Sequence, residues 1–431
     1  MRYTKSLIAL ACFTTLFCNA QFGFDNYALH YLNIIDVNSK QILKDYSIVI
    51  YNDKIIDILP TKNFIENDST QSIILKNKFA LPGLIDAHVH FATDPTEERR
   101  DNAEKILKEM LLTGITSVRD MAGDTRALSS LSRNTLVGDI DGPNIYYSAL
   151  MAGPKFFSDP RTIATAQGGI SGKMPYMKAI DSTSNLALEV AQAKGTGATG
   201  IKLYANLSKQ DINDIVKEAK KQKINVWSHA ALKPTKPSEV ISSGVISISH
   251  INMLLQEKYL ADEELIDKWK NFKSGQNDSA FWDKEYKNLE FSELYTLMIE
   301  NNVVLDATIT VLDKYKEYPK YVWYYEIGTR IAAEANKKGV LIAAGSDSDQ
   351  KTFVQYEIKL LVNECGFSPM DGIVSATKHS AMATGILETE GTIENGKKAN
   401  LLILNTNPTI DIENIDDVFM VVKNGKLYNP K

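Results

Sequence analysis

The protein has 431 residues, and its 48 Lys and Arg against 53 Asp and Glu give a formal net charge of −5. With 44% hydrophobic and 23% charged residues, the composition is typical of a soluble globular protein with one large domain and a smaller one, and it excludes collagen-like, coiled-coil and disordered chains. The acidic balance and the lack of a Lys/Arg run also argue against nucleic-acid binding, which needs a concentrated basic surface.

The first twenty residues have the pattern of a secretory signal peptide. Two basic residues precede an apolar stretch from Leu7 to Phe17, and small residues up to Ala20 offer a cleavage site. A lipoprotein anchor at Cys18 is the alternative. We therefore expect an exported protein, periplasmic or secreted, whose mature chain begins near Gln21. No later stretch approaches the ~20 apolar residues of a membrane-spanning helix.

Short β segments are expected at both ends of the mature chain. Residues 27–81 alternate apolar and polar side chains in runs broken by Asn-Asp and Asp-Lys turns, and the same pattern returns in 400–404 and 418–427. These flanking segments could pair into one small β-sandwich around a central insertion. The expected organisation is a signal peptide at 1–20, sandwich arms at 21–80 and 390–431, and a barrel at 81–389.

Between the arms, short and nearly all-apolar segments alternate with helical stretches, as parallel strands buried on both faces should. Helices are expected from Glu97 to Thr113, from a capping box at Ser208 and Asp211, and over 321–339. The eight candidate strands are Ala80–His90, Ile115–Asp120, Asn144–Leu150, Gly200–Ala205, Asn225–Ala230, Val245–His250, Val303–Ile309 and Val340–Asp347.

Eight β-then-α units in about 300 residues predict the α/β class and a (β/α)8 TIM barrel. A doubly wound open sheet is the rival architecture. It usually has fewer strands and a glycine-rich phosphate turn after the first strand, where this chain has His-Val-His.

Residues that bind metals end several of these strands. His88 and His90 lie two apart at the end of the first strand, so both imidazoles point to the same side. The fifth, sixth and eighth strands end at His229, His250 and Asp347. In a barrel these ends meet at the carboxyl rim, where active sites are built. One such histidine is more often structural, but the five-residue set predicts a metal site.

Lys202 lies in the fourth predicted strand, among apolar neighbours. A charged lysine is costly to bury unless it is paired or chemically changed. A deprotonated lysine can take up carbon dioxide and become a carbamate, which can bridge two divalent cations. The alternative is a lysine whose side chain extends along the barrel to solvent at the rim.

The ordered motifs resemble the amidohydrolase superfamily over nearly the whole mature chain. They are LPGLIDAHVH at 81–90, GITSVRD at 114–120, GIK at 200–202, SHA at 228–230, SH at 249–250, AGSDS at 344–348 and GTIENGKKANL at 391–401. Within the superfamily the sequence is most similar to the imidazolonepropionase-like and prolidase-like (exported dipeptidase) branch. Members of this branch with a lysine on the fourth strand typically hold two metals bridged by its carbamate.

This resemblance implies two divalent metal ions and a set of ligands. The implied ligands are His88, His90 and Asp347 for one ion, His229 and His250 for the other, and carboxylated Lys202 for both. Zinc suits such ligands, as do manganese, cobalt and iron. A hydroxide that bridges the metals would attack the carbonyl carbon, and Asp347 would carry the proton to the leaving nitrogen.

Two residues are candidates for substrate contacts. Tyr204 lies two positions after Lys202, and it either donates to the developing oxyanion or packs at the barrel mouth. The loop after the third strand lacks the histidine that some dipeptidase relatives carry there. Arg161 in this loop could bind a substrate carboxylate, or it could belong to a solvated turn. The long segment 254–289 is either a lid, a contact in a homo-oligomer or a packed helical hairpin.

The expected function is a binuclear metal-dependent hydrolase that cleaves an amide C–N bond in a small-molecule substrate, either a dipeptide or an N-acyl amino acid. The same site could instead hydrolyse a cyclic amide, a lactone or an ester. A different class is a non-catalytic periplasmic binding protein, which predicts that ligands have been lost. No expected ligand is missing from this sequence.

Overall fold

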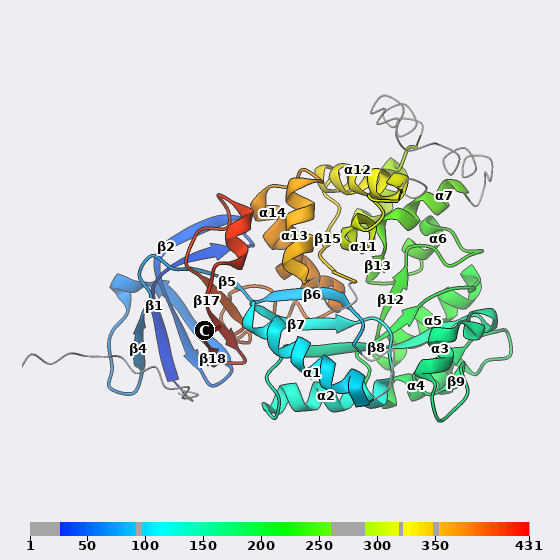
Figure 1. The fold of residues 1–431 in the computed structure, drawn as a ribbon, viewed down its shortest axis with the longest axis horizontal. Helices are drawn as coiled ribbons and strands as arrows, with labels where there is room; N and C mark the ends of the chain where they lie inside the picture. Colours follow the sequence, from blue (N-terminus) through cyan, green and yellow to red (C-terminus); the bar gives the residue numbers. More distant parts are fainter. Residues whose placement is uncertain (1–25, 92–96, 260–288, 319–321, 348–352, 431) are drawn as a thin grey trace, which may run out of the picture.

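The computed structural model describes residues 26–91, 97–259, 289–318, 322–347 and 353–430. These residues form two sheets, each with its own set of strands. The strands from the two chain ends, blue and red in Figure 1, lie together in the smaller body, and the middle of the chain builds the larger one. The expected signal peptide at 1–20 and most of the segment 254–289 lie outside the described residues.

The smaller body is one mixed sheet in the order β18-β17-β16-β5-β1-β2-β3, with β4 beside β1. Its strands are β1 (Asn26–Asp36), β2 (Gln41–Tyr51), β3 (Lys54–Pro60), β4 (Gln71–Ile74), β5 (Phe79–Pro82), β16 (Leu401–Leu404), β17 (Val418–Lys423) and β18 (Lys426–Tyr428). The antiparallel pair β5 and β16 joins the two chain ends. The predicted pairing of the two arms is confirmed.

Strand β16 contributes to two cores because side chains alternate along a strand. Leu401 and Ile403 belong to the apolar core of the small sheet, whereas Leu402 and Leu404 belong to the core of the barrel. The strand therefore anchors the small sheet to the barrel.

The larger body is the predicted (β/α)8 barrel. Its parallel strands follow one another as β6 (Leu84–Val89), β7 (Ile115–Asp120), β8 (Asn144–Ala152), β11 (Gly200–Leu203), β12 (Asn225–His229), β13 (Ser247–Ser249), β14 (Val304–Asp306) and β15 (Ile342–Ala343). Two backbone hydrogen bonds close the ring: Ala87 N–H donates to Ala344 O (3.0 Å) and Asp347 N–H donates to His88 O (2.8 Å). This closure rules out the open doubly wound sheet.

The first predicted strand, Ala80–His90, is wrong as a single strand. It divides at Gly83 into β5 of the small sheet and β6 of the barrel. A Cβ at Gly83 would lie 2.2 Å from the Thr116 hydroxyl oxygen, so only glycine lets the chain pass this close to β7. Both halves are apolar, so the sequence pattern did not reveal the division.

The structure also contains a short hairpin that the sequence did not predict, formed by β9 (Lys173–Met174) and β10 (Met177–Ala179). Its strand β10 pairs with the end of β8.

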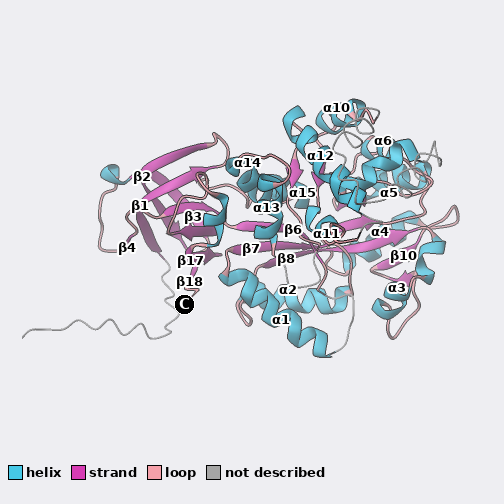
Figure 2. Ribbon diagram, turned by 45° about the horizontal axis from the view of Figure 1, so that its top comes forward, coloured by secondary structure: helices cyan, strands magenta, loops and turns pink. Residues whose placement is uncertain are grey.

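Helices surround the barrel, as Figure 2 shows. The longer ones are α1 (Glu97–Leu112), α2 (Thr125–Val137), α4 (Leu186–Gly195), α5 (Lys209–Gln222), α10 (Ser292–Glu300), α12 (Val322–Lys338) and α13 (Val354–Asn363). The shorter ones are α3 (Pro160–Thr165), α6 (Pro237–Ile241), α7 (Gln256–Tyr259), α11 (Ile309–Asp313), α14 (Pro369–Val374) and α15 (Ser380–Thr384).

The predicted capping box starts α5. The Asp211 backbone N–H donates to Ser208 Oγ (3.2 Å), and the Ser208 N–H donates back to the Asp211 carboxylate (3.0 Å). Ile212, Ile215 and Ala219 then form the buried stripe that packs this helix on the barrel. Among the described helices, none combines the length and the apolar character needed to cross a bilayer.

Candidate metal centre

Four histidines gather at the carboxyl ends of three barrel strands. The ring centroids of His88 and His90 lie 5.2 Å apart, those of His88 and His250 5.0 Å, and those of His229 and His250 4.8 Å. His88 and His229 lie within their strands, while His90 and His250 come directly after them. The closed barrel thus brings residues that are far apart in the sequence into one cluster.

Asp347 completes this cluster. Its Oδ1 lies 3.2 Å from His90 Nε2 and 3.8 Å from His88 Nε2, and its Oδ2 lies 3.7 Å from His250 Nδ1. One ligand atom each from His88, His250 and Asp347 lies within 4.8 Å of the others, the short spacing expected of residues that line a metal site. Burial alone would raise the pKa of Asp347, but the imidazoles of His88 and His90 outweigh it and hold that pKa well below the usual range.

An oxygen atom holds each of the four imidazoles through Nδ1. The oxygens are Asp306 Oδ2 for His88 (2.7 Å), Ala122 O for His90 (3.2 Å), Tyr204 O for His229 (2.9 Å) and Thr308 Oγ1 for His250 (3.0 Å). The carboxylate and carbonyl oxygens only accept, so His88, His90 and His229 carry a proton on Nδ1 and have the lone pair on Nε2, the arrangement of histidines that bind metals. The Thr308 hydroxyl can donate or accept, so it fixes the position of the His250 ring.

The Nε2 atom of His229 is buried and has no hydrogen-bond partner among the described residues. An orphaned buried nitrogen is costly, and a metal ion would satisfy it. Burial lowers the pKa of His229 well below its ordinary value and that of His250 to about 3, so both rings are neutral near pH 7, as metal ligands must be. The donor set therefore fits a divalent cation.

Lys202 is fully buried, so its side chain does not extend to solvent at the rim. Its Nζ donates to Ser249 Oγ at 3.0 Å. Burial, reinforced by the positive charge of Arg119, lowers the pKa of Lys202 to about 7. A substantial fraction of this amine is thus neutral at physiological pH, the form that can react with carbon dioxide.

Sequence reasoning missed a buried carboxylate, Asp306, at the end of β14. It accepts hydrogen bonds from His88 Nδ1, Ser249 Oγ (2.9 Å) and the Arg119 guanidinium (3.2 Å). Burial alone would raise the pKa of Asp306, but His88 and Arg119 lower it, so the group is ionised. An acidic residue in an apolar predicted strand was the available signal.

Arg119 on β7 is the buried cation that balances this carboxylate. Besides Asp306 it donates to Ala87 O (2.6 Å), Ser247 Oγ (2.7 Å) and Ala383 O (2.7 Å). Close packing around the pair extends to Gly345, where an added Cβ would lie 2.3 Å from Asp306 Oδ1. The charged pair therefore lies inside the barrel beside His88, and Asp306 packs closely against Gly345.

Of the two substrate candidates, Tyr204 lies beside His229. The Tyr204 ring centroid is 4.0 Å from that of His229 and 4.6 Å from that of Phe156. Burial raises the pKa of Tyr204, while neighbouring Arg161 acts in the opposite direction. Arg161 is largely exposed and donates to both carboxylate oxygens of Asp159, at 3.1 and 2.7 Å. Arg161 thus borders Tyr204 but is already paired.

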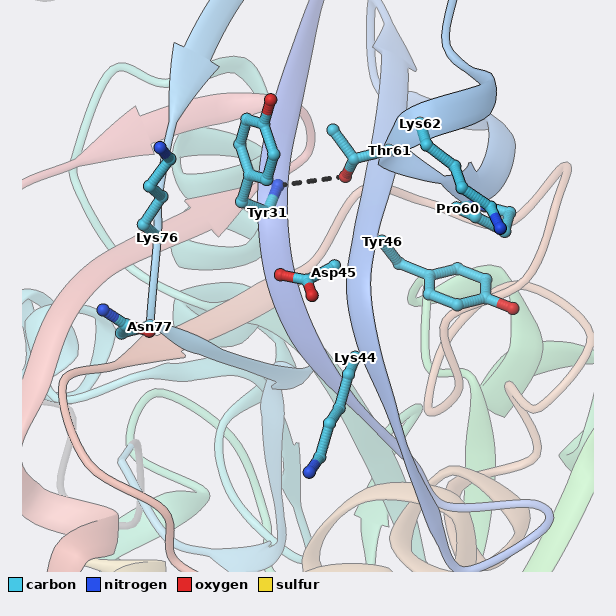
Figure 3. A pocket seen from close by; sticks show the side chains of 9 residues that line it. All are labelled: Tyr31, Lys44, Asp45, Tyr46, Pro60, Thr61, Lys62, Lys76 and Asn77. Atoms are coloured by element: carbon cyan, nitrogen blue, oxygen red, sulfur yellow. Dashed lines mark hydrogen bonds between the residues drawn. The ribbon is translucent and has the colours of Figure 1, made fainter.

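A separate cavity of about 750 Å³ lies in the small sheet, and none of the predicted site residues lines it. It is lined by Tyr31, Lys44, Asp45, Tyr46, Pro60, Thr61, Lys62, Lys76 and Asn77. In Figure 3 the ammonium ends of Lys44, Lys62 and Lys76 point to different sides and do not converge on one point. Among the described residues, the predicted metal ligands therefore lie at the barrel rim, away from this cavity.

Comparison with known proteins agrees with this architecture. Ochratoxinase from Aspergillus niger is 24% identical over 446 residues, which cover 90% of this chain and 83% of that protein. The crystal structure of an Xaa-Pro dipeptidase with bound methionine in the active site superposes with a TM-score of 0.73 at 25% identity, covering 94% of this chain and 100% of that one. The crystal structure of A. niger ochratoxinase has a TM-score of 0.73 at 20% identity, covering 94% and 96%, and shows a shared fold.

The sequence model of the Amidohydrolase family matches residues 79–428, which include the whole barrel and the C-terminal strands of the small sheet. The protein therefore belongs to the amidohydrolase family and is a hydrolase that acts on amide bonds.

Proposed function

We propose that this protein is a binuclear metal-dependent amidohydrolase that cleaves the amide bond of a dipeptide or an N-acyl amino acid. The observation that carries the proposal is the cluster of four imidazoles at the barrel rim with Asp347 beside three of them, each imidazole having an oxygen atom within 3.2 Å of its Nδ1. The buried and unpartnered Nε2 of His229 supports it. The similarity to an Xaa-Pro dipeptidase favours a peptide-like substrate.

The proposed ligands fall into two groups around Lys202. His88, His90 and Asp347 would hold one cation, zinc being the first candidate, and His229 and His250 the other. Carboxylated Lys202 would hold both. When bound, two such cations lower the pKa of a water molecule and polarise the scissile carbonyl.

Asp347 is the proposed proton carrier. Its low pKa keeps it ionised at neutral pH, so it can accept a proton from the attacking water and donate it to the leaving nitrogen. Tyr204 stays protonated because burial raises its pKa, and its hydroxyl would donate to the carbonyl oxygen as negative charge develops there. Arg161, beside Tyr204, would exchange Asp159 for a substrate carboxylate.

Hydrolysis of a cyclic amide, a lactone or an ester at the same site is the alternative, because the same attack serves all of these carbonyl groups. A non-catalytic binding protein would be expected to have lost ligands, and all six proposed ligand residues are present. We also propose that residues 1–20 direct export to the periplasm or the medium.

Metal analysis combined with a substrate screen tests the proposal. Protein stripped with a chelator should lose hydrolysis of Xaa-Pro dipeptides and N-acyl amino acids, regain it with Zn²⁺ or Mn²⁺, and bind two equivalents of metal per chain. His229→Gln should lose metal, whereas the control His30→Gln, on β1 of the small sheet, should bind two equivalents. Full activity of stripped protein, or a single bound equivalent, would overturn the binuclear assignment.

A further inference from the structure

The His250 ring contacts a residue that follows the next barrel strand. His250 Nδ1 lies 3.0 Å from Thr308 Oγ1. The backbones at the ends of β13 and β14 are also joined, since His250 N–H donates to Asp306 O (3.0 Å) and Ile251 N–H donates to Ala307 O (3.2 Å). The imidazole and the hydroxyl that holds it thus sit on two coupled segments.

Thr308 has an unusual backbone conformation. Its φ is +52°, in the left-handed region that a β-branched residue rarely adopts, and its side chain is buried. Such a conformation is unfavourable for a β-branched residue and persists only where the surroundings hold it. His250 itself has a φ of +72°. Something must therefore fix the turn that begins at Thr308.

Glu357 on α13 provides that support. Its carboxylate accepts hydrogen bonds from the backbone N–H groups of Ile309 (2.8 Å) and Thr310 (2.7 Å) and from the Thr310 hydroxyl (2.7 Å). The Glu357 side chain is fully buried, and a buried carboxylate is tolerated only when donors satisfy it. These three donors all belong to the two residues directly after Thr308.

We propose that Thr308 and Glu357 are positioning residues for the His250 metal ligand. Glu357 fixes the turn at 309–310, the turn holds Thr308 in its left-handed conformation, and the Thr308 hydroxyl bonds Nδ1 of His250 and fixes the ring beside Asp347. The inference rests on the proposed binuclear function, and it assigns a role to a carboxylate that touches neither metal nor substrate.

Without the Thr308 hydroxyl, the His250 ring loses the hydrogen bond that fixes its rotamer, so it can turn away from the metal position. Loss of a group that orients a metal ligand typically costs 10–100-fold in metal affinity. The loss should fall on the cation that His250 binds and leave the other cation nearly unaffected.

Metal titration of the stripped full-length protein tests this inference independently of activity. The titrant is Co²⁺, followed by its visible absorption, with two binding constants fitted. We expect Thr308→Ala to weaken one of the two equivalents by about 10–100-fold, Thr308→Ser to restore most of that loss, and Glu357→Gln to weaken the same equivalent. Thr329→Ala is the matched control, because this buried threonine bonds carbonyl oxygens within its own helix α12.

Wild-type affinity for both equivalents in Thr308→Ala would overturn the inference, as would a serine variant no better than alanine. His250→Ala separates this failure from that of the proposed function. If His250→Ala loses one equivalent and Thr308→Ala does not, only the positioning role fails. If His250→Ala also binds both equivalents normally, His250 is not a ligand and the proposed ligand set is wrong. Should Glu357→Gln not fold, as judged by circular dichroism, the two Thr308 variants decide the question.

Discussion

His88 Nδ1 and Asp306 Oδ2 lie 2.7 Å apart in the fully enclosed interior of the barrel, and Arg119 donates to the same carboxylate oxygen. One carboxylate thus fixes the orientation of a metal-binding ring and balances the charge of a buried guanidinium. A substitution at Asp306 should therefore affect both the stability of the protein and its affinity for metal.

Asp306→Asn should lower both stability and metal affinity. It leaves Arg119 buried without its counter-charge, and breaking a buried ion pair in this way typically costs about 3–5 kcal/mol. A fall in Tm together with weaker metal binding is expected from calorimetry and metal titration. Asp139→Asn is the control, because Asp139 pairs with Arg133 on the surface and such pairs contribute about 0–1 kcal/mol. Equal Tm values for the two variants would contradict this account.

Lys202→Ala should lose most of its activity and bound metal if the lysine is carboxylated and bridges two metals. Short carboxylic acids such as formate or acetate should restore part of both, because they can occupy the space of the carbamate. Metal content and hydrolysis are measured with and without the added acid. An active Lys202→Ala enzyme with full metal content would return Lys202 to a structural role.

Asp347→Asn should fold and retain some metal, because the amide oxygen can still act as a ligand. It cannot take up a proton, so kcat should fall by at least the ~10²-fold typical of a lost general base. Steady-state kinetics at saturating metal measure the effect. Turnover within a few-fold of the wild type would move the proton transfer elsewhere, with His250 the next residue to substitute.

His379 makes stability depend on pH outside the metal site. It ends the π-helix η4 (Ser375–His379), its Nδ1 donates to Ile342 O (3.1 Å), and burial lowers its pKa to about 4. The unfolded chain takes up this proton near pH 6.5, before the folded protein does. The neutral ring therefore makes its full contribution to the free energy of unfolding above about pH 6.5, and this contribution is lost as the pH falls toward about 4.

His379→Gln keeps an N–H donor but does not titrate, so its stability should fall less than that of the wild type between pH 7.5 and 4.5. The difference should reach at most about 3 kcal/mol. Denaturant unfolding of both stripped proteins at several pH values measures it, and contributions common to both proteins cancel. Parallel pH profiles would show that His379 is not the responsible group.

Export predicts a processed N-terminus. If residues 1–20 are a signal peptide, intact-mass analysis of the exported protein should show a chain that begins at or near Gln21. A lipid-modified chain that begins at Cys18 would favour the anchor instead. Exported protein that retains Met1 would refute both.

Sequence periodicity was sufficient to predict the barrel and its rim, because eight apolar segments bounded by polar residues can pack in few ways. It also placed His88, His90, His229, His250 and Asp347 at strand ends, which the structure brings together. Sequence could not identify the groups that orient these ligands. Asp306, Ala122 O and Tyr204 O meet the imidazoles only after the strands have closed into a ring, and no local pattern encodes such a meeting.

The sheet that unites the two chain ends has a consequence for biogenesis. Tyr27 donates from its hydroxyl to Gly425 O, a contact between positions 398 apart in the sequence, and Leu81 pairs with Leu402. Contacts of such long range close large loops and form late in folding. During synthesis, the edge of β5 that pairs with β16 stays unpaired until β16 has been synthesised. We expect truncation before β16 to leave an aggregation-prone product, because the open edge of β5 can pair with another chain.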